Sequence, residues 1–262
     1  MTVVTRASNI FTAPNLPIMS DLIKSGMVLG LRPVQTTGVI DISPSQASLT
    51  AVGAPTMTAA GVRVGPMNYY RSNVQEPRNL TLIAGFRISS GPSLSGTAQL
   101  IGSLRGSFSA SNGSGIYAGL FASSPNYIGL TYGSSNGPGG SRASVFPTGV
   151  VIAQPAPTNY VSPWLWCAVT IDSDGIAGRR YVAKAEGPIV AVAANGLTAA
   201  MGDRDRASLI LGAFDDVAVD NHWRFEMAEL LVYNRAFSEA EVQQQYRDSL
   251  LYMKAIGAQI GT

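Results

Sequence analysis

The segment Glu226-Met-Ala-Glu229 is the nearest approach in this chain to the carboxylate pair of a glycosidase. Such enzymes need two carboxylates that flank the scissile bond, about 5 Å apart in retaining and about 6.5–9.5 Å apart in inverting enzymes. The apolar run around the pair predicts a strand from Phe225 to Tyr233, and side chains three residues apart on a strand point to opposite faces. We therefore expect no catalytic residue and no enzymatic activity, and we interpret Glu229 as a structural hydrogen-bond acceptor.

The chain has one histidine, His222, and one cysteine, Cys167. A Ser-His-Asp triad would have to use His222 as its base, but no Gly-x-Ser-x-Gly elbow accompanies it. Single residues of these types also exclude an intramolecular disulfide and multi-ligand His or Cys metal sites. Cys167 alternates with apolar Leu165 and Val169, so we expect an inert core thiol. No cofactor is expected.

Acidic side chains gather in the segment 202–206 and again at Asp215, Asp216 and Asp220. Calcium binds clustered carboxylate and carbonyl oxygens, but neither group has the Asp-x-Asp-x-Asp-Gly order of an EF-hand loop. The second group is the candidate for calcium. Solvated loop carboxylates are the simpler interpretation, and we expect no metal.

Aromatic and amide side chains together suggest a sugar site, because a sugar offers C–H faces beside its hydroxyls. The best local cluster is Tyr127, Tyr132 and Asn136, next to the Gly-rich loop 133–140. The segment Tyr69-Tyr-Arg71 forms a second cluster. Aromatic residues at strand ends also pack in cores and rims, so both readings stay open.

Only 13% of the 262 residues are charged and 46% are apolar, with a mean hydropathy of +0.16. This balance is the opposite of a disordered chain and fits one large domain or at most two small ones. The net charge is +2 without a Lys/Arg cluster, so no nucleic-acid partner is expected. So few ionic groups favour a protein that hides part of its surface against neighbours, and we expect a homo-oligomer.

Membrane insertion is not expected, because no stretch approaches the roughly 18 uninterrupted apolar residues of a span. The start of the chain lacks an apolar run behind a basic end, so we expect no signal peptide.

From Gly26 onward, short runs rich in Val, Ile, Leu, Tyr and Phe alternate with Gly, Pro, Ser and Asn, which is typical of all-β proteins. The clearest strand spans Leu80 to Ile88, with five apolar residues on one face: Leu80, Leu82, Ala84, Phe86 and Ile88. Residues 1–25, with Pro14 and Pro17, are expected to form an extended arm, and 26–262 a single domain.

One helix is predicted at about residues 238–254. Ser238 and Glu241 form a capping box, and Phe237 with Val242 forms the matching hydrophobic staple. Its packed face is predicted to hold Val242, Tyr246, Leu250 and Met253. Its other face should be in water and holds Gln243, Gln244, Arg247 and Asp248.

The succession of these segments resembles the laminin-G-like branch of the concanavalin A-like lectin and glucanase jelly rolls. The segments that carry the resemblance are Trp164–Asp172, Arg180–Val182, Leu209–Ala213 and, above all, the final strand and capped helix in Phe225–Val242. Gly30–Pro33 with Ile40–Ser43 is similar to that family's opening strand and Asp-x-Ser turn, and the resemblance covers about Gly26 to Met253.

The resemblance implies an all-β, two-sheet antiparallel jelly-roll sandwich with one C-terminal helix. The glucanase motif Glu-x-Asp-x-x-Glu is absent, which leaves binding rather than catalysis. Such domains without a secretion signal occur in bacteriophage virions, so we expect a non-enzymatic tail, fibre or capsid-associated component that contacts itself and other virion proteins and serves host attachment. The alternative is a lectin module that binds cell-surface glycan.

Overall fold

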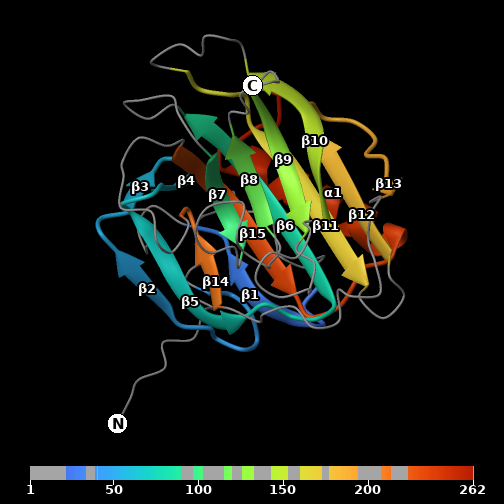
Figure 1. Ribbon diagram of the computed structural model, residues 1–262, viewed down its shortest axis with the longest axis horizontal. Coiled ribbons are helices and arrows are strands. Elements are labelled where there is room, and N and C mark those ends of the chain that lie inside the picture. The colour runs from blue at the N-terminus through green and yellow to red at the C-terminus, as the bar shows by residue number, and fades with distance from the viewer. Residues whose placement is uncertain are drawn as a thin grey trace.

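The computed structural model describes residues 22–33, 39, 41–89, 97–102, 115–119, 126–132, 143–152, 160–172, 177–193, 208–213 and 224–261. For 97–98, 115–119, 126–132 and 143–152 it describes the backbone alone. Figure 1 shows two antiparallel sheets stacked face to face, with the single helix of the described residues behind them. The expected sandwich with a C-terminal helix is therefore confirmed.

The eight-stranded sheet has the order β13-β12-β11-β6-β15-β4-β3, and β1 also pairs with β15. Its strands are β1 (Met27–Leu31), β3 (Thr56–Thr58), β4 (Gly61–Val64), β6 (Leu80–Ser89), β11 (Leu165–Asp172), β12 (Ala177–Ala183), β13 (Val192–Ala193) and β15 (Arg224–Tyr233). The long, buried strands β6, β11 and β15 form its centre, which places the most apolar runs of the sequence where both faces are covered.

The seven-stranded sheet has the order β10-β9-β8-β7-β14-β5-β2. Its strands are β2 (Leu49–Val52), β5 (Tyr69–Gln75), β7 (Thr97–Gly102), β8 (Gly115–Gly119), β9 (Asn126–Tyr132), β10 (Ala143–Ile152) and β14 (Ser208–Leu211). The turn between β4 and β5 carries the chain from one sheet to the other, closed by a backbone pair between Gly65 and Asn68.

The main core lies between the sheets. The five apolar residues predicted for one face of β6 all belong to it, as do Leu165, Cys167, Val169 and Ile171 of β11. Cys167 is fully buried, and burial raises the pKa of its thiol to about 12. The predicted inert core thiol is confirmed.

The outer face of the eight-stranded sheet is covered by α1 (Glu239–Ala255). The predicted capping box is present: the Glu241 N–H donates to the Ser238 hydroxyl at 3.3 Å, and the Ser238 N–H donates to the Glu241 carboxylate at 2.9 Å. Phe237 and Val242 are both buried in this second core, as the staple requires. Within the described residues, no helix is long and apolar enough to cross a membrane.

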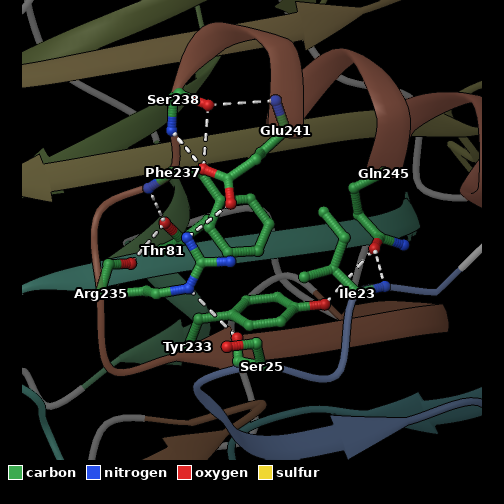
Figure 2. Close-up of polar contacts among 9 residues, drawn as sticks. All are labelled: Ile23, Ser25, Thr81, Tyr233, Arg235, Phe237, Ser238, Glu241 and Gln245. Carbon is green, nitrogen blue, oxygen red and sulfur yellow. Dashed lines mark hydrogen bonds and ion pairs between the residues drawn. The ribbon is translucent and has the colours of Figure 1, made fainter.

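Figure 2 shows how the start of α1 is joined to distant segments. The Thr81 hydroxyl of β6 accepts from the Phe237 N–H at 2.9 Å and donates to the Arg235 carbonyl at 2.8 Å. The Gln245 side-chain oxygen accepts from the Ile23 N–H at 3.2 Å. The chain before β1 is thereby fixed to the helix.

The buried face of α1 is wider than the spacing of its apolar residues predicts. Gln245, Asp248 and Ser249 are buried in addition to the apolar residues, so the prediction that Asp248 lies in water is wrong. The reason is tertiary: Arg32, which follows β1, reaches the Asp248 carboxylate under the helix. A buried cation stabilises a carboxylate that the sequence pattern alone assigns to solvent.

Candidate functional site

The first predicted sugar cluster lies mostly beyond what the structure describes. Tyr127 and Tyr132 stand near opposite ends of β9, paired with Gly119 of β8 and Ala143 of β10 respectively. Their side chains, and Asn136 altogether, lie outside the described residues. The calcium candidates Asp215, Asp216 and Asp220, and likewise His222, also lie outside them. These predictions stay untested.

The second predicted cluster, Tyr69-Tyr-Arg71, is divided by the alternation of β5. Tyr70 packs against the core between the sheets, where burial raises the pKa of its phenol. Tyr69 and Arg71 lie on the other side of the strand: Arg71 donates to the Tyr69 hydroxyl at 3.1 Å, and its guanidinium lies 5.7 Å from the ring centroid. Two of the three residues are therefore brought together on the outer face of the seven-stranded sheet.

Further polar residues extend this pair along β5. Asn73 and Gln75 alternate with the buried Ser72 and are exposed like Arg71. On the neighbouring strand, Thr50 of β2 is directly opposite Arg71 and is exposed too. We call Thr50, Tyr69, Arg71, Asn73 and Gln75 the β5 strip. The period-two order Tyr-x-Arg-x-Asn-x-Gln is visible in the sequence and places Asn73 and Gln75 on the same face as Tyr69 and Arg71. The predicted cluster included neither of them.

The β5 strip offers hydrogen-bonding groups rather than an aromatic platform. Tyr69 is only 6% exposed, so its ring supports the Arg71 guanidinium instead of presenting a face to a ligand. Guanidinium, amide and hydroxyl groups are the donors and acceptors that match sugar hydroxyls. β5 and β9 are separated by three strands, so these two strands lie about 19 Å apart at the usual strand spacing.

The two glutamates of β15 lie on the same face, and the prediction of opposite faces is wrong. Glu226 pairs with Arg87 of β6, whereas Glu229 pairs with Gly85, two residues away on that strand. A β-bulge between Met227 and Glu229 inserts one extra residue, Ala228, so that the Glu229 side chain points to the same face as Glu226. Nothing in the local sequence signals this bulge.

Glu229 belongs to a buried ionic cluster with Arg32 and Asp248. The Arg32 Nε donates to Glu229 Oε1 at 2.8 Å, and Arg32 Nη2 is paired with the Asp248 carboxylate. The Arg32 guanidinium also lies over the Tyr252 ring, 4.4 Å from its centroid. Gln245 completes the surroundings by donating to Asp248 Oδ2 at 3.2 Å. The cluster joins three segments that are far apart in the sequence.

Burial and charge act in opposite directions in this cluster. Burial raises the pKa of Glu229 above its usual range, and the Arg32 guanidinium reverses only part of that rise. Burial alone would lower the pKa of Arg32, but Glu229 and Asp248 raise it above its usual value. Arg32 therefore stays charged beside two carboxylates, and Glu229 is confirmed as an acceptor within the structure.

Metal ligands do not gather in the part of the chain that the structure describes: no group of three or more His, Cys, Asp or Glu side chains is found there. The β5 strip is a surface of the described residues that combines exposure with sugar-matching groups. It is the candidate functional site.

Solved structures similar to this chain are binding domains of botulinum neurotoxins. The domain of neurotoxin DC in complex with SialylT has 12% sequence identity and a TM-score of 0.58 over 87% of this chain. The serotype D binding domain has 13% identity and a TM-score of 0.59 over 87%. The serotype D ligand binding domain in complex with N-acetylneuraminic acid has 12% identity and a TM-score of 0.58 over 87%.

This chain spans 52–53% of the length of those toxin chains. No protein-family model and no curated protein matches the sequence. At 12–13% identity, the likeness shows the fold and assigns no ligand. What the comparisons establish is the sandwich fold that this chain shares with those binding domains.

Proposed function

We propose that this chain is a lectin-like module that binds glycan. The observation that carries the proposal is the likeness, over 87% of the chain, to binding domains solved with a sialylated ligand and with N-acetylneuraminic acid. The fold has two outer sheet faces, and α1 covers part of that of the eight-stranded sheet. The β5 strip lies on the outer face of the seven-stranded sheet, on the edge strand β2 and the adjacent strand β5, and its exposed groups are the ones that this proposal assigns to the ligand.

The β5 strip supports the proposal by its chemistry. Its exposed groups lie on two adjacent strands of one sheet, which fixes their spacing. Asn73 is held further by the Ser48 N–H, which donates to its side-chain oxygen at 3.0 Å. A ligand that binds groups already held in place loses less entropy on ordering them. Glycan binding at the strip would use hydrogen bonds to hydroxyls, with Arg71 giving a preference for acidic sugars.

A glycan microarray with the full chain tests the proposal, followed by titration with the best ligand. Arg71→Ala and Asn73→Ala should each weaken binding about tenfold, the equivalent of one or two hydrogen bonds. Arg247→Ala, on the exposed side of α1, removes the same charge as Arg71→Ala far from the strip and is the matched control. Retained binding in both β5 variants would move the site elsewhere, and Tyr132→Ala then tests the first predicted cluster. A blank array would overturn the function.

A non-enzymatic role accompanies this proposal. Glu226 and Glu229 are on one face and both are paired with arginines, which supports a structural role for each carboxylate. A reducing-sugar release assay on the array ligands checks it: we expect no release above the buffer control.

Host attachment from a phage particle, and self-association, stay predictions. Residues 1–21 of the predicted arm, 1–25, lie outside the described residues, and the similar structures named above are toxin domains. Deleting Met1–Ser20 should abolish incorporation or self-association while leaving glycan binding intact. A truncated protein that still assembles would show that the arm is not needed for assembly.

A further inference from the structure

Three polar side chains cross the outer face of the eight-stranded sheet in one row. Glu226 of β15 is paired with Arg63 of β4 on one side and with Arg87 of β6 on the other. We call these three residues the arginine row. The side chains of Arg63 and Arg87 are 49% and 33% exposed, so this part of the face remains open to solvent beside the part that α1 covers.

Both guanidiniums approach the same carboxylate oxygen. Arg87 contacts Glu226 Oε2 through Nη2 at 2.6 Å and through Nε at 2.7 Å, and Arg63 Nη2 lies 4.0 Å from that atom. The other oxygen, Oε1, accepts from the Thr58 hydroxyl at 2.5 Å. One carboxylate thus faces two cations, and the row has a net charge of +1.

The two arginines have different roles in this geometry. Arg87 is fixed: its guanidinium is held by Glu226 and lies 4.9 Å from the ring centroid of the buried Trp164. Arg63 touches the carboxylate only at the limit of an ion pair and is half exposed. Its fork of N–H donors is therefore directed less to Glu226 than to the surrounding water.

We propose that the arginine row is a binding site for one oxyanion group, the sulfate or carboxylate of an acidic saccharide. A guanidinium fork matches such groups in a bidentate geometry, and the excess positive charge favours them. The Trp164 ring holds the Arg87 guanidinium in place before binding, which lowers the ordering cost. The site lies on a different sheet from the β5 strip, and it stands whether or not that strip binds glycan.

The overall charge of the protein sets the size of the ligand group. A net charge of +2 over 262 residues gives no extended basic surface. A nucleic acid or a densely sulfated polymer draws most of its affinity from many neutralised charges at once. The arginine row supplies a single excess charge, so it fits one anionic group on an otherwise neutral sugar.

Titration of the full chain at low salt, followed by NMR of the arginine Nε–H groups, tests the site. The probes are glucose 6-sulfate, glucuronic acid, inorganic sulfate and neutral glucose. The first two should shift the Arg63 and Arg87 signals, and glucose should not. Whichever of glucose 6-sulfate and glucuronic acid binds more tightly identifies sulfate or carboxylate as the preferred group. Comparison of glucose 6-sulfate with inorganic sulfate shows whether the sugar ring adds affinity.

Variants separate a binding site from a structural ion pair. Arg63→Ala should weaken binding about tenfold with the fold retained, since this side chain is half exposed. Arg179→Ala is the matched control: it removes a 51% exposed arginine of the same sheet, paired with Glu239 at 3.8 Å. Glu226→Gln should strengthen binding, because it removes the carboxylate that competes with the ligand. A structural pair predicts no such gain.

Three results would overturn the proposal. They are the absence of any shift with the two acidic sugars, equal losses in Arg63→Ala and Arg179→Ala, and an affinity that Glu226→Gln leaves unchanged or lowers in a protein that is still folded.

Discussion

The outer face of the eight-stranded sheet contains two ionic groups with the same ingredients and different surroundings. Glu229 and its partner Arg32 are almost fully buried under α1, whereas Glu226 faces two arginines that are partly in water. Both glutamates come from one strand, three residues apart, and share a face because of the bulge at Ala228. The cover of α1 makes the Arg32–Glu229 group a buried structural ion pair, whereas the group around Glu226 lies beside the helix and is open to ligands.

Removing the cation from the buried group should give the largest effect. Arg32→Met keeps the packing of the stem but leaves Glu229 and Asp248 buried without a positive charge, and we expect a loss of about 3–5 kcal/mol in the free energy of unfolding. Arg63→Met, in the open group, should cost less than about 1 kcal/mol. Urea unfolding of both variants checks the comparison, and equal costs would show that burial does not distinguish the two groups.

Close approach of the helix to the sheet should be the next most sensitive feature. Gly85 pairs with Glu229 and lies two residues before Arg87 on β6, and a Cβ there would clash with the sulfur of the buried Met253. Gly85→Ala should therefore destabilise by about 1–3 kcal/mol through overpacking. In the double variant with Met253→Ala the two costs should be less than additive, because the new methyl group enters the space that Met253 leaves. Full additivity would place the strain elsewhere.

The sequence predicted well those parts of this architecture that depend on local periodicity. The buried face of β6, the placement of Cys167 and the capping box all follow from spacing within a few residues, and all are confirmed. The opening strand and the Asp-x-Ser turn are present as well: Asp41 Oδ1 accepts from the Ser43 N–H at 3.0 Å.

What the sequence missed depends on contacts between distant segments. The bulge at Ala228 shifts the faces of β15, and Arg32 reaches Asp248 from 216 residues away. Strands β2 and β3 are short and contain no fully buried residue, so they lack the apolar alternation that identifies a strand. In the candidate site, the pair Tyr69 and Tyr70 was visible in the sequence. The sequence did not show that Tyr69 is buried or that Tyr70 points into the core between the sheets.

Glu229 and Glu241 should respond to pH with opposite signs. The folded-state pKa of Glu229 is raised, so its contribution is fully present below the unfolded pKa of about 4.3 and is lost as pH rises through the folded value. Burial alone would raise the pKa of Glu241, but the Ser238 N–H and Arg235 lower it, so its contribution is lost as pH falls through the folded value. Unfolding from pH 3 to 7 measures both.

The two Gln variants isolate these contributions. Relative to wild type, Glu229→Gln should gain stability as pH rises above about 4.3, whereas Glu241→Gln should lose stability as pH rises from the folded-state pKa of Glu241 up to about 4.3. Slopes of the same sign in both difference curves would mean that Arg32 outweighs burial at Glu229.

Neutralising Glu226 should give the smallest change in stability and the clearest dependence on salt. Glu226→Gln leaves Arg63 and Arg87 facing each other. The Glu226 side chain is only 6% exposed, but both arginines reach water and the Gln oxygen can still accept from Thr58, so the cost should be about 1 kcal/mol. The Debye length falls from about 30 Å at 0.01 M salt to about 3 Å at 1 M, so high salt should remove most of that cost. The cost of Arg32→Met should persist at high salt, because ions do not reach its buried carboxylates. Urea unfolding of both variants at the two salt concentrations measures this. A salt-independent cost for Glu226→Gln would mean that the group around Glu226 is a second structural ion pair.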